Sequence, residues 1–118
     1  MDDLIAFLAA RLGEDEALAK RGEEVFATGW PDYQTFDSPE LDDACKYLDR
    51  FGPARVLREV EAGRRILARY QDCLARMEDP DYPHAVARDQ AREYEDFVLP
   101  NLLTRWAGHR DYRQEWRP

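Results

Sequence analysis

The amino-acid sequence predicts a mainly α-helical protein. We expect a four-helix bundle-like single domain over residues 1–118, with a short aromatic loop or β-hairpin between the first two helices. Three observations support this expectation. Apolar residues recur at helical steps, prolines and glycines separate the periodic stretches, and the charged fraction of 36% suits long helices with solvated outer faces.

The stretch Pro53–Met77 is the clearest helix and the centre of the predicted fold. Pro53 suits a first helical position, because it has a fixed φ and no amide hydrogen to satisfy. Apolar residues at three-, four- and seven-residue steps share one face: Val56, Val60, Leu67, Tyr70, Leu74 and Met77. Arginines fall on roughly the opposite face: Arg55, Arg58, Arg65, Arg69 and Arg76. We expect one side of this helix to pack and the other to carry cations.

Two helices are expected before the central one. The first begins at Asp2 or Asp3, whose carboxylates complement the positive helix end, and ends near residues 20–22. Residues 23–38 are crowded with aromatics, glycine and proline, which indicates an irregular loop or a hairpin. Ser38 then caps a second helix that begins with Pro39 and runs to about Phe51.

One further helix is expected after the central one. Residues 78–83 contain two prolines and read as a turn, and the following helix begins near Pro83. Pro100 cannot donate a backbone hydrogen bond, so it should kink or divide that helix. Gly108 ends the helix, and a tail over residues 109–118 closes the chain.

The net charge of −8 is confined to the first part of the chain. Residues 1–50 hold thirteen acidic and five basic residues, whereas residues 51–118 hold twelve of each. This balance argues against general binding to nucleic acid or to an anionic membrane. The main interpretation is a solvated acidic face. The alternative is a surface that meets a basic partner or imitates DNA.

Nothing in the sequence predicts export or a membrane span. The apolar run at the N-terminus is broken by Arg11 and begins with acids, unlike a signal peptide. No run approaches the roughly 20 apolar residues of a membrane helix. Cys45 and Cys73 stand far apart, so we expect free thiols and a cytoplasmic protein.

Catalytic signatures are weak. His84 and His109 are the only histidines, and no pair of histidines or cysteines has metal-ligand spacing. Ser38, the only serine, already has a capping role, and glycine-rich phosphate loops are absent. We therefore predict no catalytic residue, no metal and no cofactor. A small enzyme with an acidic pocket near the aromatic segment stays open as an alternative.

Two stretches are candidate interaction surfaces. In the tail, Tyr112 and Trp116 are four residues apart, as are Arg113 and Arg117, and these residue types dominate protein–protein hot spots. The favoured alternative is that the aromatic tail folds back and covers its own core. On the central helix, Arg58, Arg65 and Arg69 could meet a partner, or pair with acids inside the fold.

Three blocks together resemble a known family: DLIAFLAARLGEDEALA at 3–19, RFGPARVLREVEAGRRIL at 50–67 and HRDYRQEWRP at 109–118. The chain resembles a domain-of-unknown-function family of small actinobacterial and actinophage proteins. Members of that family carry an acid where this chain has Gly52, a lysine where it has Gly63, and a proline where it has Arg110. The resemblance implies no activity or ligand. It implies a cytoplasmic or phage-borne accessory protein.

The function we predict is therefore a non-catalytic protein–protein interaction module, associated with a phage or mobile element. Its expected partner is a protein of unknown identity, with a homodimer as an alternative. A small enzyme with an acidic pocket and an acidic DNA mimic are the competing hypotheses.

Overall fold

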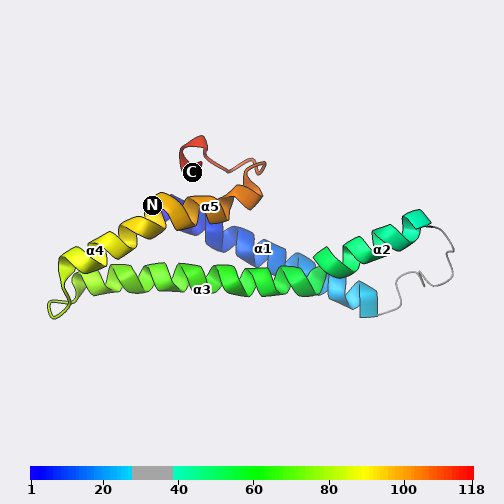
Figure 1. The fold of residues 1–118 in the computed structure, drawn as a ribbon, viewed down its shortest axis with the longest axis horizontal. Coiled ribbons are helices and arrows are strands. Elements are labelled where there is room, and N and C mark those ends of the chain that lie inside the picture. The colour runs from blue at the N-terminus through cyan, green and yellow to red at the C-terminus, as the bar shows by residue number, and fades with distance from the viewer. Residues whose placement is uncertain (28–38) are drawn as a thin grey trace. The chain divides into compact units, whose positions relative to one another are not determined.

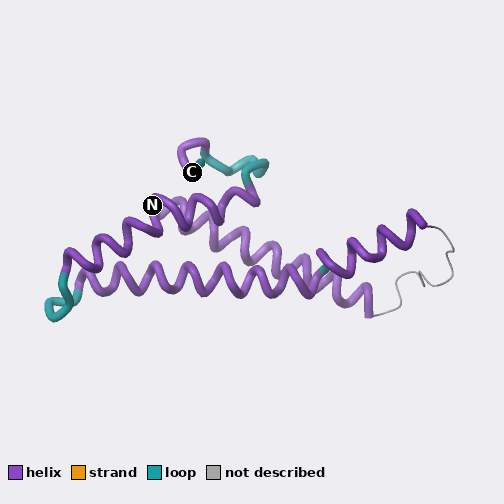
Figure 2. The backbone as a smooth tube through the Cα atoms, viewed as in Figure 1, coloured by secondary structure: helices purple, strands orange, loops and turns teal. Residues whose placement is uncertain are grey.

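A computed structural model describes residues 1–27 and 39–118, and every regular element in those two ranges is a helix (Figures 1 and 2). The longer helices are α1 (Asp2–Ala27), α2 (Pro39–Phe51), α3 (Pro53–Glu78) and α4 (His84–Glu93). Shorter elements follow: the π-helix η2 (Tyr94–Val98), α5 (Leu99–Leu103) and the 3₁₀ helices η3 (Thr104–Trp106) and η4 (Gln114–Trp116). The predicted mainly α-helical class is confirmed.

The chain divides into two compact units. Unit 1 comprises residues 1–11 and 62–118, and unit 2 comprises residues 12–61. Helices α1 and α3 each contribute residues to both units. Each unit is described by itself below. The single domain over residues 1–118 and the four-helix bundle stay predictions.

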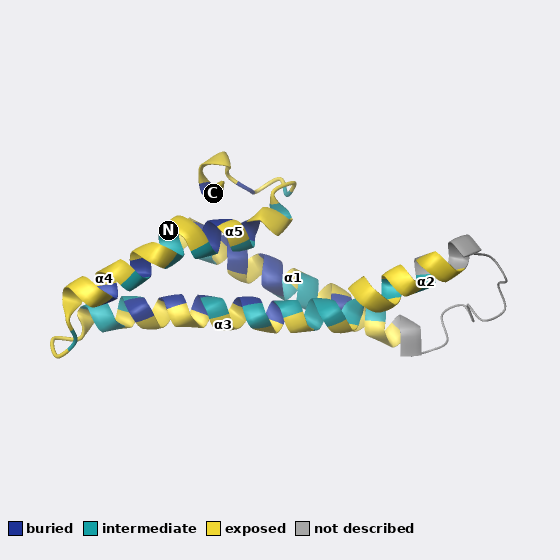
Figure 3. Cartoon of the chain, in the orientation of Figure 1, coloured by how far each residue is buried: buried dark blue, intermediate teal, exposed yellow. Residues whose placement is uncertain are grey.

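Helix α3 has the two faces that its sequence predicts. It begins at Pro53, and its buried side chains include Val60, Leu67 and Tyr70. The opposite side carries the exposed arginines, and Figure 3 shows buried and exposed patches alternating along the helix. Three other residues of the predicted apolar face are only half-buried: Val56, Leu74 and Met77. Cys73, by contrast, is fully buried, as a small core residue should be.

Helix α1 extends beyond its predicted end. It continues to Ala27, so the predicted loop is wrong for residues 23–27, and the rest of that segment, residues 28–38, lies outside the described residues. Gly22 weakens a helix by about 1 kcal/mol but does not terminate it. A Cβ atom at Gly22 would lie 3.0 Å from Cγ of Pro53. Glycine therefore lets α1 approach the start of α3 closely within unit 2.

Pro100 divides the last helical segment, as predicted. Its missing N–H leaves no donor for the carbonyl of Asp96, and its ring would collide with that carbonyl in a regular α-helix. The chain responds by widening into the π-helix η2, in which the N–H of Leu99 donates to the carbonyl of Tyr94. The side-chain amide of Asn101 donates to the carbonyl of Phe97 (2.7 Å). The carbonyls of Tyr94 and Phe97 thus accept hydrogen bonds beside the proline.

The turn between α3 and α4 shapes unit 1. Pro83 caps α4, and its carbonyl accepts hydrogen bonds from the N–H groups of Val86 and Ala87. The chain reverses direction at this turn, so α3 and α4 form a helical hairpin (Figure 1). The buried residues of unit 1 come from the first turns of α1, from α3, α4 and α5, and from the tail. They include Leu4, Phe7, Leu8, Leu67, Tyr70, Cys73, Ala87, Ala91, Leu99, Leu103, Tyr112 and Trp116.

Candidate functional site

The tail aromatics belong to the core of unit 1. Tyr112 and Trp116 are only 8% and 9% exposed. Both rings pack on Phe7 of α1, with centroid distances of 6.1 Å for Tyr112 and 5.1 Å for Trp116. They also meet each other edge to face at 5.9 Å. Such aromatic geometry adds to the stabilisation from burial. Folding back over the core therefore accounts for the spacing of these two aromatics.

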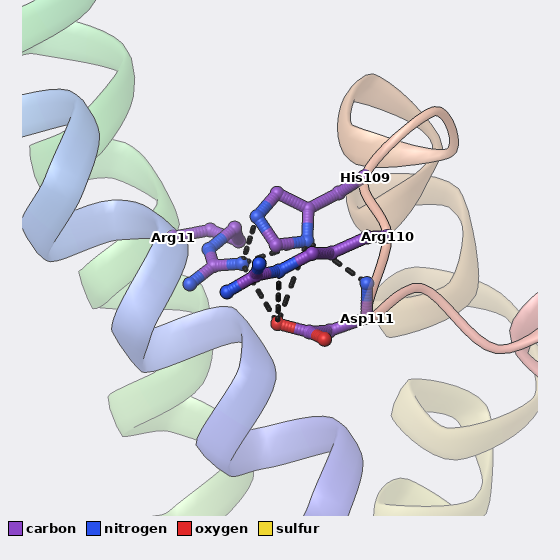
Figure 4. A network of polar contacts seen from close by, with 4 residues as sticks. All are labelled: Arg11, His109, Arg110 and Asp111. Carbon is purple, nitrogen blue, oxygen red and sulfur yellow. Dashed lines mark hydrogen bonds and ion pairs between the residues drawn. The ribbon is translucent and has the colours of Figure 1, made fainter.

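A polar network fixes the start of the tail to α1. Figure 4 shows Arg11 reaching from α1 toward His109 and Asp111. Its Nη1 atom donates to Nδ1 of His109 (2.9 Å) and lies 3.9 Å from Oδ2 of Asp111. The backbone N–H of Asp111 donates to the same ring nitrogen (3.1 Å). Arg11 is buried, and its guanidinium also lies over the Phe7 ring at 5.1 Å. The buried charge is thus compensated by groups from both segments.

The tail arginines are on the surface. Arg113 forms an ion pair with Asp3 of α1 (2.9 Å), and its guanidinium lies 5.4 Å from the centre of the Trp116 ring. Arg117 is exposed. A shallow pocket of about 230 Å³ lies between α1 and the tail, lined by Asp3, Ala6, Phe7, Ala10, Arg11, Asp111, Arg113 and Trp116. Of the four predicted tail residues, only the two arginines remain accessible to a partner, and their docking role stays a prediction.

The arginine row of α3 is accessible. Arg58, Arg65 and Arg69 are all exposed, as the helical spacing predicts. Nη1 of Arg69 lies 3.9 Å from Oδ2 of Asp72, one turn further along the helix. Ion pairs of this exposed kind contribute little stability. Whether this row meets a partner stays a prediction.

A more exposed aromatic row lies where α2 meets α3, in unit 2. Tyr47 is 63% exposed and Phe51 is 42% exposed, although the two rings contact each other at a tilt of 36°, with centroids 4.8 Å apart. The guanidinium of Arg55 lies 4.4 Å from the centre of the Phe51 ring, and Nε of Arg55 donates to Glu59 (2.7 Å). We name Tyr47, Phe51 and Arg55 the junction surface. Its four-residue spacing across Gly52 was the sequence signal that could have found it.

Gly52 makes this row continuous. Its carbonyl accepts hydrogen bonds from the N–H groups of Arg55 and Val56, which begin α3 directly after α2. A Cβ atom at position 52 would lie 2.2 Å from the carbonyl oxygen of Leu48. No side chain fits that contact, so glycine is what allows α2 and α3 to join so tightly.

A pocket lies beside the junction surface. Its volume is about 440 Å³, and we name it the junction pocket. Its described lining residues are Glu23, Leu48, Asp49, Gly52, Pro53 and Ala54. Leu48, Pro53 and Ala54 supply apolar walls, and the exposed carboxylates of Glu23 and Asp49 lie at its edge. The pocket therefore combines an apolar wall with two anionic groups.

The whole chain, residues 1–118, matches the model of one family, described as a family of unknown function (DUF6221). The chain belongs to this family. The predicted membership of a domain-of-unknown-function family is therefore confirmed. Comparison with curated proteins gives no match, and comparison with solved structures gives none either. Membership of DUF6221 itself assigns no chemistry, so the residues on the surface must carry the functional argument.

Two titratable side chains near the junction, Cys45 and Lys46, have raised pKa values. Burial raises the pKa of the Cys45 thiol, and the carboxylates of Asp42 and Asp49 raise it further. A hydrogen bond to Asp42 raises the pKa of Lys46, and the two charged atoms are 2.9 Å apart. Cys45 is therefore held as the thiol, which is a weak nucleophile. The charge of Lys46 is directed at a neighbouring carboxylate.

Among the described residues of unit 1, Tyr70 has the most strongly shifted pKa. Its hydroxyl donates to Oε1 of Glu95 (2.8 Å). Burial raises the pKa of Tyr70 well above its usual range, and the hydrogen bond to Glu95 adds to the shift. Cys73 and the neighbouring Gln90 help to line a separate pocket of about 200 Å³. The neutral Tyr70 hydroxyl therefore acts as a structural link between α3 and η2.

Within residues 1–27 and 39–118, no group of three or more His, Cys, Asp or Glu side chains could hold a metal ion. His84 is the exposed first residue of α4, and His109 belongs to the Arg11 network. The same part of the chain contains no helix that is both long and apolar enough to cross a bilayer.

Proposed function

We propose that this member of DUF6221 is a non-catalytic protein–protein interaction module, and that its principal contact is the junction surface of Tyr47, Phe51 and Arg55. The proposal rests on one observation: Tyr47 and Phe51 form an exposed aromatic pair, and the guanidinium of Arg55 lies against it. Tyrosine and arginine are enriched among the residues that dominate binding energy, and aromatic residues are enriched at interfaces. The two rings and Arg55 already pack against one another. They therefore lose less conformational entropy on binding than isolated side chains would.

The charge of unit 2 indicates the kind of partner. Residues 12–61 hold thirteen acidic and six basic residues, a net charge of −7, whereas the rest of the chain carries −1. Two copies of unit 2 would repel each other if they met through this region. We therefore favour a basic protein as partner over a homodimer.

The competing hypotheses fit these residues less well. The junction pocket is lined by two carboxylates, as an acidic pocket requires, but both are exposed to solvent. A general acid or base usually depends on a desolvated environment to tune its pKa. An acidic DNA mimic would use the same net charge. It would not require the accessible aromatic pair of the junction surface.

The arginines of the tail and of α3 remain secondary contacts in this proposal. Arg113, Arg117, Arg58, Arg65 and Arg69 are all exposed and could extend the interface. The proposal includes the association with a phage or mobile element that the sequence resemblance implies. The identity of the neighbouring genes tests the association with a phage or mobile element directly.

Affinity capture tests the proposal. The tagged full chain is incubated with lysate from its source organism, and the captured partner is measured by quantitative mass spectrometry. We expect the double substitution Tyr47→Ala and Phe51→Ala to reduce capture by about tenfold or more, because truncation of hot-spot residues typically costs about 1–2 kcal/mol or more.

The matched control removes exposed apolar side chains from unit 1. Val86 is 46% exposed and Phe97 is 62% exposed, so Val86→Ala with Phe97→Ala loses a similar accessible area. We expect this control to capture the partner as the wild type does. Equal losses in the two double variants, or full capture by the Tyr47 and Phe51 variant, would contradict the proposal. Circular dichroism of each variant verifies that the helices are intact.

A further inference from the structure

We infer that the junction pocket is the binding site for an arginine or lysine side chain on a basic segment of the partner protein. This inference rests on the proposed function and adds the chemistry of the partner. The pocket and the junction surface belong to the same unit, and α2 and α3 contribute to both, while α1 adds Glu23 to the pocket. The pocket and the junction surface consist of different side chains, so separate substitutions can test each of them.

The shape and lining of the pocket fit a long cationic side chain. Arginine and lysine each have an aliphatic stem and a charged end, and they bury the stem against apolar surface while the charge stays near water. Leu48, Pro53 and Ala54 provide the apolar wall. The carboxylates of Glu23 and Asp49 provide acceptors at the solvent edge, where a guanidinium or ammonium group would lie.

The two features of the junction lie on adjacent ridges of α2. At 3.6 residues per turn, Tyr47 and Phe51 form one ridge of α2, and Leu48 lies on the next, which leads to Gly52 at the junction. One segment of a partner can therefore cover the aromatic pair and place a side chain in the pocket. The aromatic pair then provides apolar contact area, and the pocket provides selectivity for a cation.

The electrostatics of unit 2 support a cationic occupant. Its net charge of −7 favours the approach of a basic segment. Two basic residues of α2 and early α3 are paired with carboxylates outside the pocket: Lys46 with Asp42 and Arg55 with Glu59. The positive charge of Arg55 beside the aromatic pair is thus offset within the surface. An acidic or neutral occupant would leave the two pocket carboxylates without a complementary charge.

The experiment uses the full chain and two peptides with carboxyfluorescein on the N-terminal amine, Leu-Arg-Leu-Arg-Arg-Leu-amide and its counterpart with glutamate in place of arginine. Fluorescence anisotropy at ~0.05 M salt measures binding, because screening weakens ionic contacts at higher concentration. We expect the arginine peptide to bind and the glutamate peptide not to bind. The double substitution Glu23→Gln and Asp49→Asn should weaken binding of the arginine peptide by about fivefold or more.

The matched control is Glu24→Gln with Asp43→Asn. These two exposed acids lie on the same helices but do not line the junction pocket, and the net charge changes by the same amount. We expect this control to weaken binding by less than about twofold. Equal weakening by both double variants would mean recognition by general charge and would overturn the inference.

Other outcomes separate this inference from the proposed function. Loss of peptide binding on Tyr47→Ala with Phe51→Ala, but not on Glu23→Gln with Asp49→Asn, would overturn the cation pocket and leave the junction surface in place. Absence of binding by the arginine peptide would also overturn the inference. The proposed function would then still be judged by affinity capture, which does not use the peptide.

Discussion

Tyr112 lies at the centre of the packing between the tail and α1. Its ring is buried against Phe7, but in the described part of the chain its hydroxyl oxygen has no hydrogen-bond partner. We expect Tyr112→Phe to leave the free energy of unfolding unchanged or to raise it by up to about 1 kcal/mol, because an unsatisfied buried hydroxyl is removed. Tyr112→Ala should lower it by about 3–5 kcal/mol through loss of the ring. Urea unfolding followed by circular dichroism measures both.

Trp116→Ala provides the corresponding check on the same cluster. Trp116 is buried to the same degree and packs on the same Phe7 ring, so a similar loss of about 3–5 kcal/mol is expected. An unchanged unfolding midpoint for the alanine variants would contradict the buried tail. In that case Tyr112 and Trp116 would again be candidates for contact with a partner.

The raised pKa of Tyr70 predicts that the free energy of unfolding depends on pH in the alkaline range. The folded protein raises the pKa of Tyr70, through burial first and the hydrogen bond to Glu95 second. A group whose pKa is raised on folding stabilises the protein below its unfolded pKa, about 10 for tyrosine, and loses that contribution as the pH rises further. The stability advantage of the wild type over Tyr70→Phe should therefore shrink between about pH 9 and about pH 12. Urea unfolding of both proteins at several pH values measures this, and a constant difference would contradict it.

At the scale of the elements, Gly52 decides how α2 joins α3. A Cβ atom at that position would collide with the carbonyl of Leu48, so the backbone must shift to admit alanine. We expect Gly52→Ala to lower the free energy of unfolding by about 1–3 kcal/mol. The control is Gly13→Ala in α1, where a Cβ atom meets nothing within 4 Å. That change should stabilise the helix by up to about 1 kcal/mol. Equal effects in urea unfolding would contradict the tight junction.

Most helix boundaries could be predicted because local chemistry sets them. Pro39 and Pro53 begin α2 and α3 as their sequences indicate, and Pro100 divides the final segment. The end of α1 could not be predicted in the same way. Gly22 would weaken a helix on its own, but its close approach to Pro53 depends on a neighbour distant in the sequence. Tertiary contacts override local propensity at such positions.

The candidate site was harder to predict than the fold. Tyr112 and Trp116 have hot-spot composition, and only burial distinguishes a core aromatic from an interface aromatic. Tyr47 is mostly exposed, and its position in the sequence alone does not distinguish it from a core aromatic. Its row with Phe51 and Arg55 crosses a helix boundary, so a search within single helices does not find it.

At the scale of the whole molecule, charge separates the two units. Unit 2 carries a net charge of −7 and holds the junction surface, whereas unit 1 is nearly neutral and uses its tail to cover its own core. This division supports one acidic, aromatic contact region and a structural role for the tail. The arginines of the tail remain the alternative place for a partner.

Site-specific photo-crosslinking tests this central claim most directly. Tyr47, Phe97 and Arg117 are replaced one at a time by p-benzoylphenylalanine, and each full-length variant is irradiated in lysate from the source organism. All three positions are exposed, so accessibility is comparable. We predict a crosslinked partner from position 47 and none from position 97. A partner crosslinked from position 117 or 97, and not from position 47, would contradict the account.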